Sequence, residues 1–473
     1  MSSKTQLQGY GTVAVVDESK ENLHEATGSW VEANVILAAK LIDNDEKNSA
    51  SSPSENDETT GSSSSSPPPV FRDVSFAFLF IAQLIAFTYT GIFYGGCSAG
   101  SDGTEDQNAN SATLDDNVED SVKLMTVLLA TSAVIAFLVT YSITAFVLPK
   151  YPTLAIKTSL YGSLITYSLL VFYLFISYSN IWTLLFFIFV VGVNLWYIVK
   201  TKKFVPFAAV NLKMASRAIS VNFGIYFVAF ITGMISVVWM GFWTYTATGL
   251  GVFQDVQNAT NSTGEQLVIM KNGYYYYYED ESDYSILGMK GFALILSLYW
   301  TLNVLANIIQ TTTAGVTGTW CYDKESAGSC CSSAVTQSLF RSCTYSLGSI
   351  CFGALLTALV STLRVLVRYL RDNSNRRSNE GAVFIYCILA CILFCLEGII
   401  EYFNEWAYVF VGIWGLDYLQ SGRRVLELFA ARGCTAIISN GLASYVLLNV
   451  VTFTSLVCGL YGYIFGGDLG SFA

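Results

Sequence analysis

The amino-acid sequence predicts an all-α protein, a polytopic helical membrane bundle with about nine hydrophobic segments. Hydrophobic residues make up 53% of the chain and charged residues only 13%, whereas soluble domains carry about 25% charged residues. The apolar segments recur evenly, and no polar stretch between them is long enough to bury its own core. We therefore expect one transmembrane bundle over residues 73–466, a cytoplasmic N-terminal tail over residues 1–72 and a short C-terminal tail over residues 467–473.

The N-terminal tail is polar and contains a run of serine and proline from Ser62 to Pro69. This composition predicts disorder. Within the tail, Trp30–Ile42 predicts a short amphipathic helix that contacts a membrane or a partner. No cleavable signal peptide is expected, because the first 30 residues or so do not combine a basic start with an apolar core.

Four apolar segments of spanning length come next, each near the 20 residues that a bilayer requires. They are Val74–Gly95, Val122–Leu148, Leu154–Tyr178 and Ile181–Val199. The loop from Cys97 to Ser121 is acidic, whereas the connectors after the second and fourth segments are basic. These basic residues are Lys150, Lys157, Lys200, Lys202, Lys203, Lys213 and Arg217. Because basic connectors favour the cytoplasmic side, the tail is predicted to be cytoplasmic and the acidic loop external.

The fifth segment, Val221–Thr246, leads to a loop with two predicted N-glycosylation sites at Asn258 and Asn261. The charge distribution independently places this loop outside. The run Tyr274–Tyr278 in the same loop is interpreted as an interfacial or loop-packing aromatic cluster rather than a binding site.

The sixth segment runs from near Gly288 to Cys321 and is unusually polar for a membrane span. On an α-helix, one arc of about 100° would carry an aromatic and amide-rich face. Its members are Trp300, Asn303, Asn307, Gln310 and Thr311. In hydrocarbon these amides need partners, so the face either bonds to neighbouring helices or lines a water-filled pathway. Both interpretations stay open from the sequence.

The seventh segment, Leu347–Val367, carries Arg364 near its end and is followed by further arginines. Simple alternation places these arginines outside, against the positive-inside rule. Either this segment re-enters without crossing, or the sixth breaks near Gly315 and Gly318, or the arginines are an exception. The eighth segment, Ala382–Ile400, has Glu397 and Glu401 near its end, and the ninth runs from Thr435 to Phe465.

The sequence lacks the residues that several classes of function require. The net charge of −10 argues against nucleic-acid binding. His24, in the tail, is the single histidine of the chain, so zinc, serine-histidine and proton-relay chemistry lack a ligand or base. Cys387, Cys391 and Cys395 share a helical face and are interpreted as core packing, not as a metal site. Hydrolase motifs are absent, so neither an enzyme nor a cofactor is expected.

Five stretches resemble the choline transporter-like family, and most closely its fungal and plant branch with the pH-nine-sensitive name. PFAAVNLKMASRAIS (Pro206–Ser220) and the segment Tyr299–Trp320 resemble the region around the family's fifth and sixth spans. SLGSICFGALLTALVSTLRVLVRYL (Ser346–Leu370), FNEWAYVFVGIWG (Phe403–Gly415) and ARGCTAIISN (Ala431–Asn440) are similar to later family blocks. The resemblance covers residues 204 to 465, and the first four spans match only by topology.

The chain also departs from the family pattern. Family members usually carry a tenth span and a cytoplasmic C-terminal tail after the segment that ends here near Phe465. With nine segments the C-terminus would be external. The difference from the family pattern is then either a real absence of the tenth span or the result of a shortened gene model. In addition, Leu416 stands where the family usually has a basic residue.

The resemblance implies a plasma-membrane transporter of choline or a related organic cation. A quaternary ammonium is held by aromatic faces, with a carboxylate sometimes nearby. Trp300, Trp320, Tyr402, Trp406 and Tyr408 are the candidate aromatic residues, and Glu397 or Glu401 the candidate carboxylate. Taken singly, each is more typical of a membrane-interface or helix-end residue. A channel-like or structural membrane protein without choline transport is the alternative function.

Overall fold

The computed structural model describes residues 70–94, 111–178, 181–250, 268–271, 274–277, 281–325, 327–328, 332–376, 380–432 and 434–465. The chain divides into two compact units, Met1–Pro67 and Pro68–Ala473, and every described residue lies in the second. Some predicted features lie outside the described residues: the tail up to residue 69 with its amphipathic helix, Asn258, Asn261 and residues 467–473.

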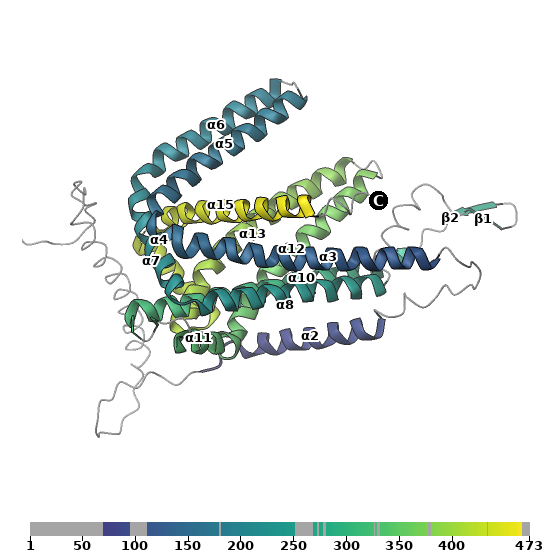
Figure 1. The fold of residues 1–473 in the computed structure, drawn as a ribbon. Coiled ribbons are helices and arrows are strands. Elements are labelled where there is room, and N and C mark those ends of the chain that lie inside the picture. The colour runs from purple at the N-terminus through teal and green to yellow at the C-terminus, as the bar shows by residue number, and fades with distance from the viewer. Residues whose placement is uncertain are drawn as a thin grey trace, which may run out of the picture. The chain divides into compact units, whose positions relative to one another are not determined.

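Helices make up nearly all of the described part (Figure 1). In chain order they are α2 (Val74–Tyr94), α3 (Ser111–Ser142), the π-helix η2 (Ile143–Val147), α4 (Leu148–Lys150), α5 (Pro152–Tyr178), α6 (Ile181–Thr201), η3 (Lys202–Phe204), α7 (Val205–Val221), α8 (Gly224–Gly249), α10 (Glu281–Tyr322), α11 (Ser333–Cys343), α12 (Leu347–Arg376), α13 (Glu380–Trp414), α14 (Tyr418–Arg432) and α15 (Cys434–Phe465). Within these residues, nine helical stretches are long and apolar enough to cross a membrane. The predicted all-α polytopic fold is therefore confirmed.

The sequence pattern does not predict the short β-hairpin that precedes α10. Strand β1 (Val268–Lys271) pairs antiparallel with β2 (Tyr274–Tyr277), and Lys271 lies opposite Tyr274. Aromatic residues favour extended backbone, so the tyrosine run has a physical reason to form a strand.

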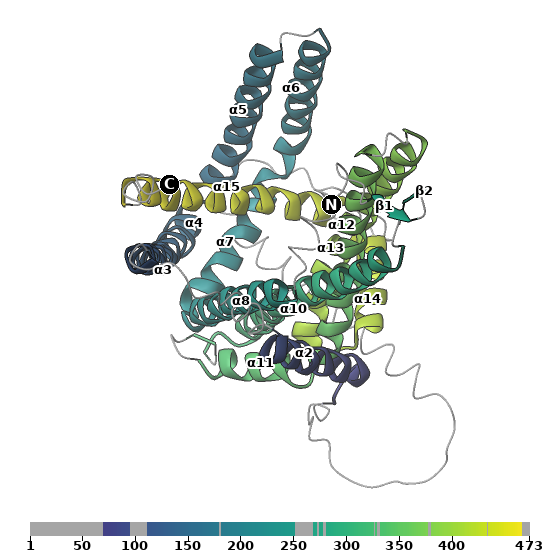
Figure 2. The same ribbon diagram turned by 90° about the vertical axis from the view of Figure 1, so that its right-hand side faces the viewer.

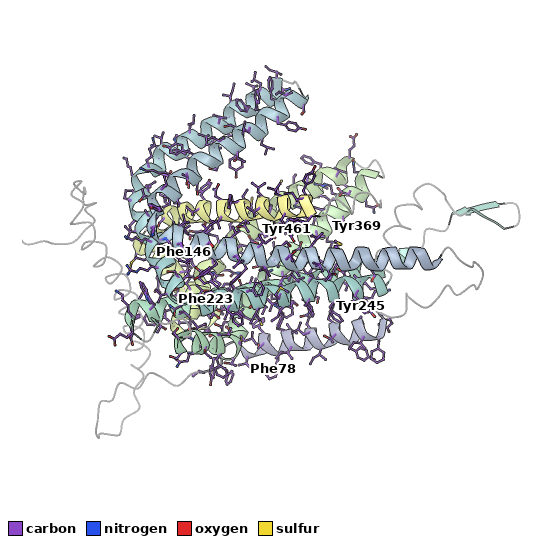
Figure 3. All side chains as sticks on the ribbon, in the orientation of Figure 1. Phe78, Phe146, Phe223, Tyr245, Tyr369 and Tyr461 are labelled. Carbon is purple, nitrogen blue, oxygen red and sulfur yellow. The ribbon has the colours of Figure 1, made fainter. Side chains whose placement is uncertain are left out.

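Apolar side chains cover the outside of the helices, as contact with lipid requires. Phe78 on α2 is an example, projecting from the helix in Figure 3. Helices α5 and α6 lie side by side in both ribbon views and expose aromatic and aliphatic side chains along their length (Figures 1 and 2). On α13, the side chains of Cys387, Cys391 and Cys395 are exposed as well. The interpretation of these thiols as core packing is wrong, because all three side chains are exposed in the described part of the chain.

Helices α10, α12 and α13 pack against one another, and α2 packs against α12. Close contact between α10 and α13 depends on Gly412, where a Cβ would lie 2.5 Å from the carbonyl oxygen of Thr311. Arg341 of α11 donates a hydrogen bond to the carbonyl oxygen of the same glycine. Burial lowers the pKa of Arg341, yet a guanidinium keeps its charge in proteins. Helix α11 is thereby joined to the α10–α13 contact.

Two of the three explanations for the arginines after the seventh segment require a broken helix. Helix α10 is continuous over 42 residues, through Gly315 and Gly318. Helix α12 is continuous over 30 residues, which corresponds to a length of about 45 Å, more than the roughly 30 Å of a hydrocarbon core. The geometry therefore favours a crossing helix and an exception to the charge rule.

Candidate functional site

Two of the predicted aromatic site residues, Trp300 and Tyr408, lie in the packed core of the bundle. Trp300 is 3% exposed, its ring meets Phe80 edge-on at 5.3 Å between centroids, and its indole N–H donates to the carbonyl oxygen of Cys351 at 3.0 Å. Tyr408 is 1% exposed and donates its hydroxyl hydrogen to the carbonyl oxygen of Ile350 at 3.3 Å. Both polar atoms therefore bond the backbone of α12, as buried polar groups require.

Asn404 connects three helices from a fully buried position. Its amide nitrogen donates to the carbonyl oxygen of Gly353 at 3.1 Å and to the hydroxyl of Thr357 at 2.9 Å, both on α12. Its amide oxygen accepts a hydrogen bond from the hydroxyl of Tyr418 on α14. Burial raises the pKa of Tyr418 to about 12, so the phenol keeps its proton at neutral pH. A Cβ at Gly353 would overlap the hydroxyl of Tyr408 and the Tyr418 ring, so this position needs glycine.

Asp73 fastens the start of α2 to the rest of the bundle. Its carboxylate accepts hydrogen bonds from the hydroxyl of Ser349 at 2.6 Å and from the backbone N–H of Tyr418 at 3.0 Å. The residue has a positive φ of 48°, a left-handed conformation that aspartate tolerates better than most side chains. Gly348 packs against the backbone of Arg72 and Asp73 with no room for a Cβ.

Arg364 and Glu397 form an ion pair between α12 and α13. A guanidinium nitrogen lies 2.6 Å from one carboxylate oxygen, and the hydroxyl of Ser361 donates to the other at 2.5 Å. The side chains are 21% and 7% exposed, respectively. Glu397 lies at the middle of α13, because this helix continues past Ile400 to Trp414. The prediction that Glu397 and Glu401 lie near the end of their span is therefore wrong.

Glu397, Glu401 and Glu405 follow one another at four-residue intervals along α13, and we call them the acidic row. Such spacing puts them on one side of the helix. The carboxylate of Glu405 accepts hydrogen bonds from Asn440 of α15 at 3.3 and 3.4 Å. Within the described residues, neither Glu401 nor Glu405 forms an ion pair. Like charges at this spacing repel each other, and carboxylates inside a span mark pathways by default.

The polar arc of α10 lies beside the acidic row. The amide nitrogen of Gln310 donates to the backbone carbonyl of Glu405 at 2.9 Å, which joins the two helices. The side chain of Asn307 lies next to the hydroxyl of Tyr408. Asn303 is half-buried on the same helix, one turn before Asn307. Trp320, near the end of α10, packs elsewhere with Ala218 and Ala334 and carries Lys324 over its ring at 5.5 Å. The structure thus brings Gln310 to the backbone of the acidic row and Asn307 to Tyr408 on the same helix, but it places Trp320 elsewhere.

Tyr402, Trp406 and Phe429 form an aromatic cluster between α13 and α14. Their ring centroids lie 5.3 to 6.3 Å apart. The hydroxyl of Tyr402 and the indole N–H of Trp406 make no well-formed hydrogen bond within the described part of the chain. Tyr402 directly follows Glu401 and Trp406 directly follows Glu405, so rings and carboxylates occupy adjoining faces of one helix.

Comparison with known proteins decides the family. The family model described as "Plasma-membrane choline transporter" matches residues 184–469, more than half of the chain. This chain belongs to the choline transporter family. The motif resemblance found in the sequence is confirmed, and the family is one of transporters.

Curated fungal relatives in the choline transporter family carry the name Protein PNS1. The one from Mycosarcoma maydis is 31% identical over 39% of this chain and 34% of its own length. The one from Yarrowia lipolytica is 24% identical over 58% of this chain and 46% of its own length. The one from Cryptococcus neoformans var. neoformans is 24% identical over 83% of this chain and 69% of its own length. The chain therefore spans less than half of the first two relatives.

Sequence reasoning missed several residues that shape the site of this choline transporter family member. Glu405 and Asn440 were not singled out, because the eighth span was expected to end at Ile400. The four-residue repeat Glu397, Glu401 and Glu405 is itself a readable signal once the helix is extended. Asp73 had no such signal, since its partners are distant in sequence.

Proposed function

We propose that this protein transports a small organic cation, of the choline or related amino-alcohol class, along the acidic row of α13. The observation that carries the proposal is the placement of Glu401 and Glu405 inside a helix of spanning length, where the carboxylate of Glu405 contacts the amide of Asn440 on α15. Arg364 offsets the charge of Glu397, so the row keeps a negative charge that a cation can balance. The family match supports transport by this chain.

The aromatic cluster Tyr402, Trp406 and Phe429 supports a quaternary ammonium as the transported head group. Such a group is attracted to aromatic faces by about 0.5–2 kcal/mol per ring. In this proposal Glu401 and Glu405 balance the charge, Asn440 positions the carboxylate of Glu405, and Gln310 holds the backbone of α13 at Glu405. The burial and backbone bonding of Trp300 and Tyr408 support a scaffold role for these two residues, beneath the cation site. The description of the family supports the plasma membrane as the location.

Uptake of labelled choline into vesicles that contain the purified protein tests the proposal. The variant Glu401→Gln/Glu405→Gln is expected to lower uptake at least tenfold, because it removes the negative charge but keeps the side-chain size. Trp406→Leu is expected to weaken choline binding several-fold to about 30-fold. Glu380→Gln is the matched control, since Glu380 is exposed at the first residue of the same helix.

Two results would contradict the proposal. If the parent protein takes up no choline, ethanolamine or similar cation, a channel-like or structural role is the better account. If the doubly substituted variant reaches the vesicles in normal amount and transports as well as the parent, the row is not the pathway.

A further inference from the structure

A second candidate site lies away from the acidic row, at the junction of α3, α5 and α15. It is a groove of about 250 Å³ whose lining includes Val147, Leu154, Thr158, Val450 and Phe453. None of its lining residues belongs to α10, α12 or α13. The proposed transport pathway therefore does not use it.

Local backbone geometry opens this groove. The end of α3 winds into the π-helix Ile143–Val147, which is wider than an α-helix and typically a local adaptation at functional sites. The chain then leaves helical geometry at Tyr151, with φ −128° and ψ 49°, before α5 begins. Ile143, Val147 and Tyr151, all from these two irregular turns, line the groove.

The groove is open on the side that faces lipid. Tyr151, Leu154 and Phe453 line it and are all exposed. Phe146, also exposed, projects beside the same junction in Figure 3. An apolar groove open to hydrocarbon suits an acyl chain, which gains by burying its CH₂ groups.

Two exposed lysines are direct sequence neighbours of residues that line the groove. Lys150 directly precedes Tyr151, and Lys157 lies between Leu154 and Thr158 on α5. Both lysines are exposed, and no lining residue is acidic. Basic residues beside an apolar surface between spans attract anionic lipid head groups.

We propose that this groove binds an anionic phospholipid, with one acyl chain between α5 and α15 and the phosphate at Lys150 and Lys157. The lipid would come from the leaflet on the side of the lysine-rich connectors. Occupancy would fill the gap left by the π-helix and join α3, α5 and α15.

Lipid binding by the full chain tests this proposal. The purified protein is titrated in detergent with dioleoylphosphatidylserine or dioleoylphosphatidylcholine, and bound lipid is counted by native mass spectrometry. The parent protein should retain more dioleoylphosphatidylserine than dioleoylphosphatidylcholine. Lys150→Gln/Lys157→Gln should weaken this binding by about fivefold per lysine. Lys202→Gln/Lys203→Gln changes the net charge equally at exposed lysines outside the groove and should have little effect.

A second pair of variants tests the acyl chain. Thr158→Phe should fill the groove and lower retention of both lipids, whereas Thr153→Phe places the same ring at an exposed, non-lining position of α5. Equal losses from the two lysine pairs would show only a diffuse basic surface. Normal retention by Thr158→Phe, or competition by glycerophosphoserine as effective as by the intact lipid, would overturn the acyl-chain assignment.

Discussion

At the scale of single residues, the Arg364–Glu397 pair illustrates how the fold carries charge in the centre of a span. Both groups are mostly withdrawn from solvent, and Ser361 completes the coordination of the carboxylate. Removing one member of a buried pair leaves the other unpaired, which typically costs 3–5 kcal/mol. The pair therefore contributes to structure whatever its part in transport.

We predict that Arg364→Ala lowers the amount of folded protein in the membrane and the midpoint of thermal unfolding before it changes substrate selectivity. The double variant Arg364→Met/Glu397→Leu should recover much of the loss, because two apolar groups replace the pair without an orphaned charge. Scanning fluorimetry of detergent-purified protein measures both. Normal expression of Arg364→Ala with altered selectivity would refute this structural role.

Trp300 provides a second residue-scale prediction. Trp300→Leu should lower stability on the order of 2–4 kcal/mol, because it leaves a cavity and removes the buried hydrogen bond from the indole to the Cys351 carbonyl. The choline KM of the surviving protein should change little. Trp300→Phe should recover the ring packing against Phe80 but not the hydrogen bond. A stable Trp300→Leu protein with choline binding weakened several-fold would instead return Trp300 to the cation site.

At the scale of elements, the contact between α10 and α13 depends on Gly412, because a residue with a Cβ at this position would overlap Thr311. We predict that Gly412→Ala lowers stability by about 1–3 kcal/mol, because the new Cβ would press on Thr311 and disturb the Arg341 bond. Gly398→Ala is the control on the same helix, where a Cβ meets nothing within 4 Å. This second change should be neutral or stabilising, since alanine favours helix over glycine. If Gly412→Ala and Gly398→Ala changed the unfolding midpoint equally, the contact between α10 and α13 would not require glycine at position 412.

The helices themselves were largely predictable from sequence, because a span needs a long apolar run that few other structures use. Their ends were less so. The predicted eighth span ends at Ile400, just before the polar residues Glu401, Asn404 and Glu405, yet α13 continues to Trp414. Asn404 is satisfied by α12 and α14, and such partners from other helices are invisible in a local pattern. For the same reason the sequence does not distinguish a packing role of Trp300, bonded to Cys351 of α12, from a role in binding a quaternary ammonium.

At the scale of the whole molecule, the topology remains a prediction with a direct test. We expect the N-terminus to be cytoplasmic and the loop with Asn258 and Asn261 to be external. Protein made in a eukaryotic host should shift to higher mobility on glycosidase treatment. The variant Asn258→Gln/Asn261→Gln should show no shift. Reaction of a tag in this loop with a cytoplasmic probe would overturn the orientation.

The bonds of Asp73 have a consequence for how the protein is made. One partner, Ser349, is 276 residues later in the chain, and the other, the N–H of Tyr418, is 345 residues later. Ribosomes add about 5–20 residues per second, so roughly 17–70 s separate the synthesis of Asp73 from that of Tyr418. The first span can pack against α8 earlier, but the bonds that hold its start cannot form until the last third of the chain emerges. Its final docking is a late step of biogenesis, although it is the first span to be synthesised.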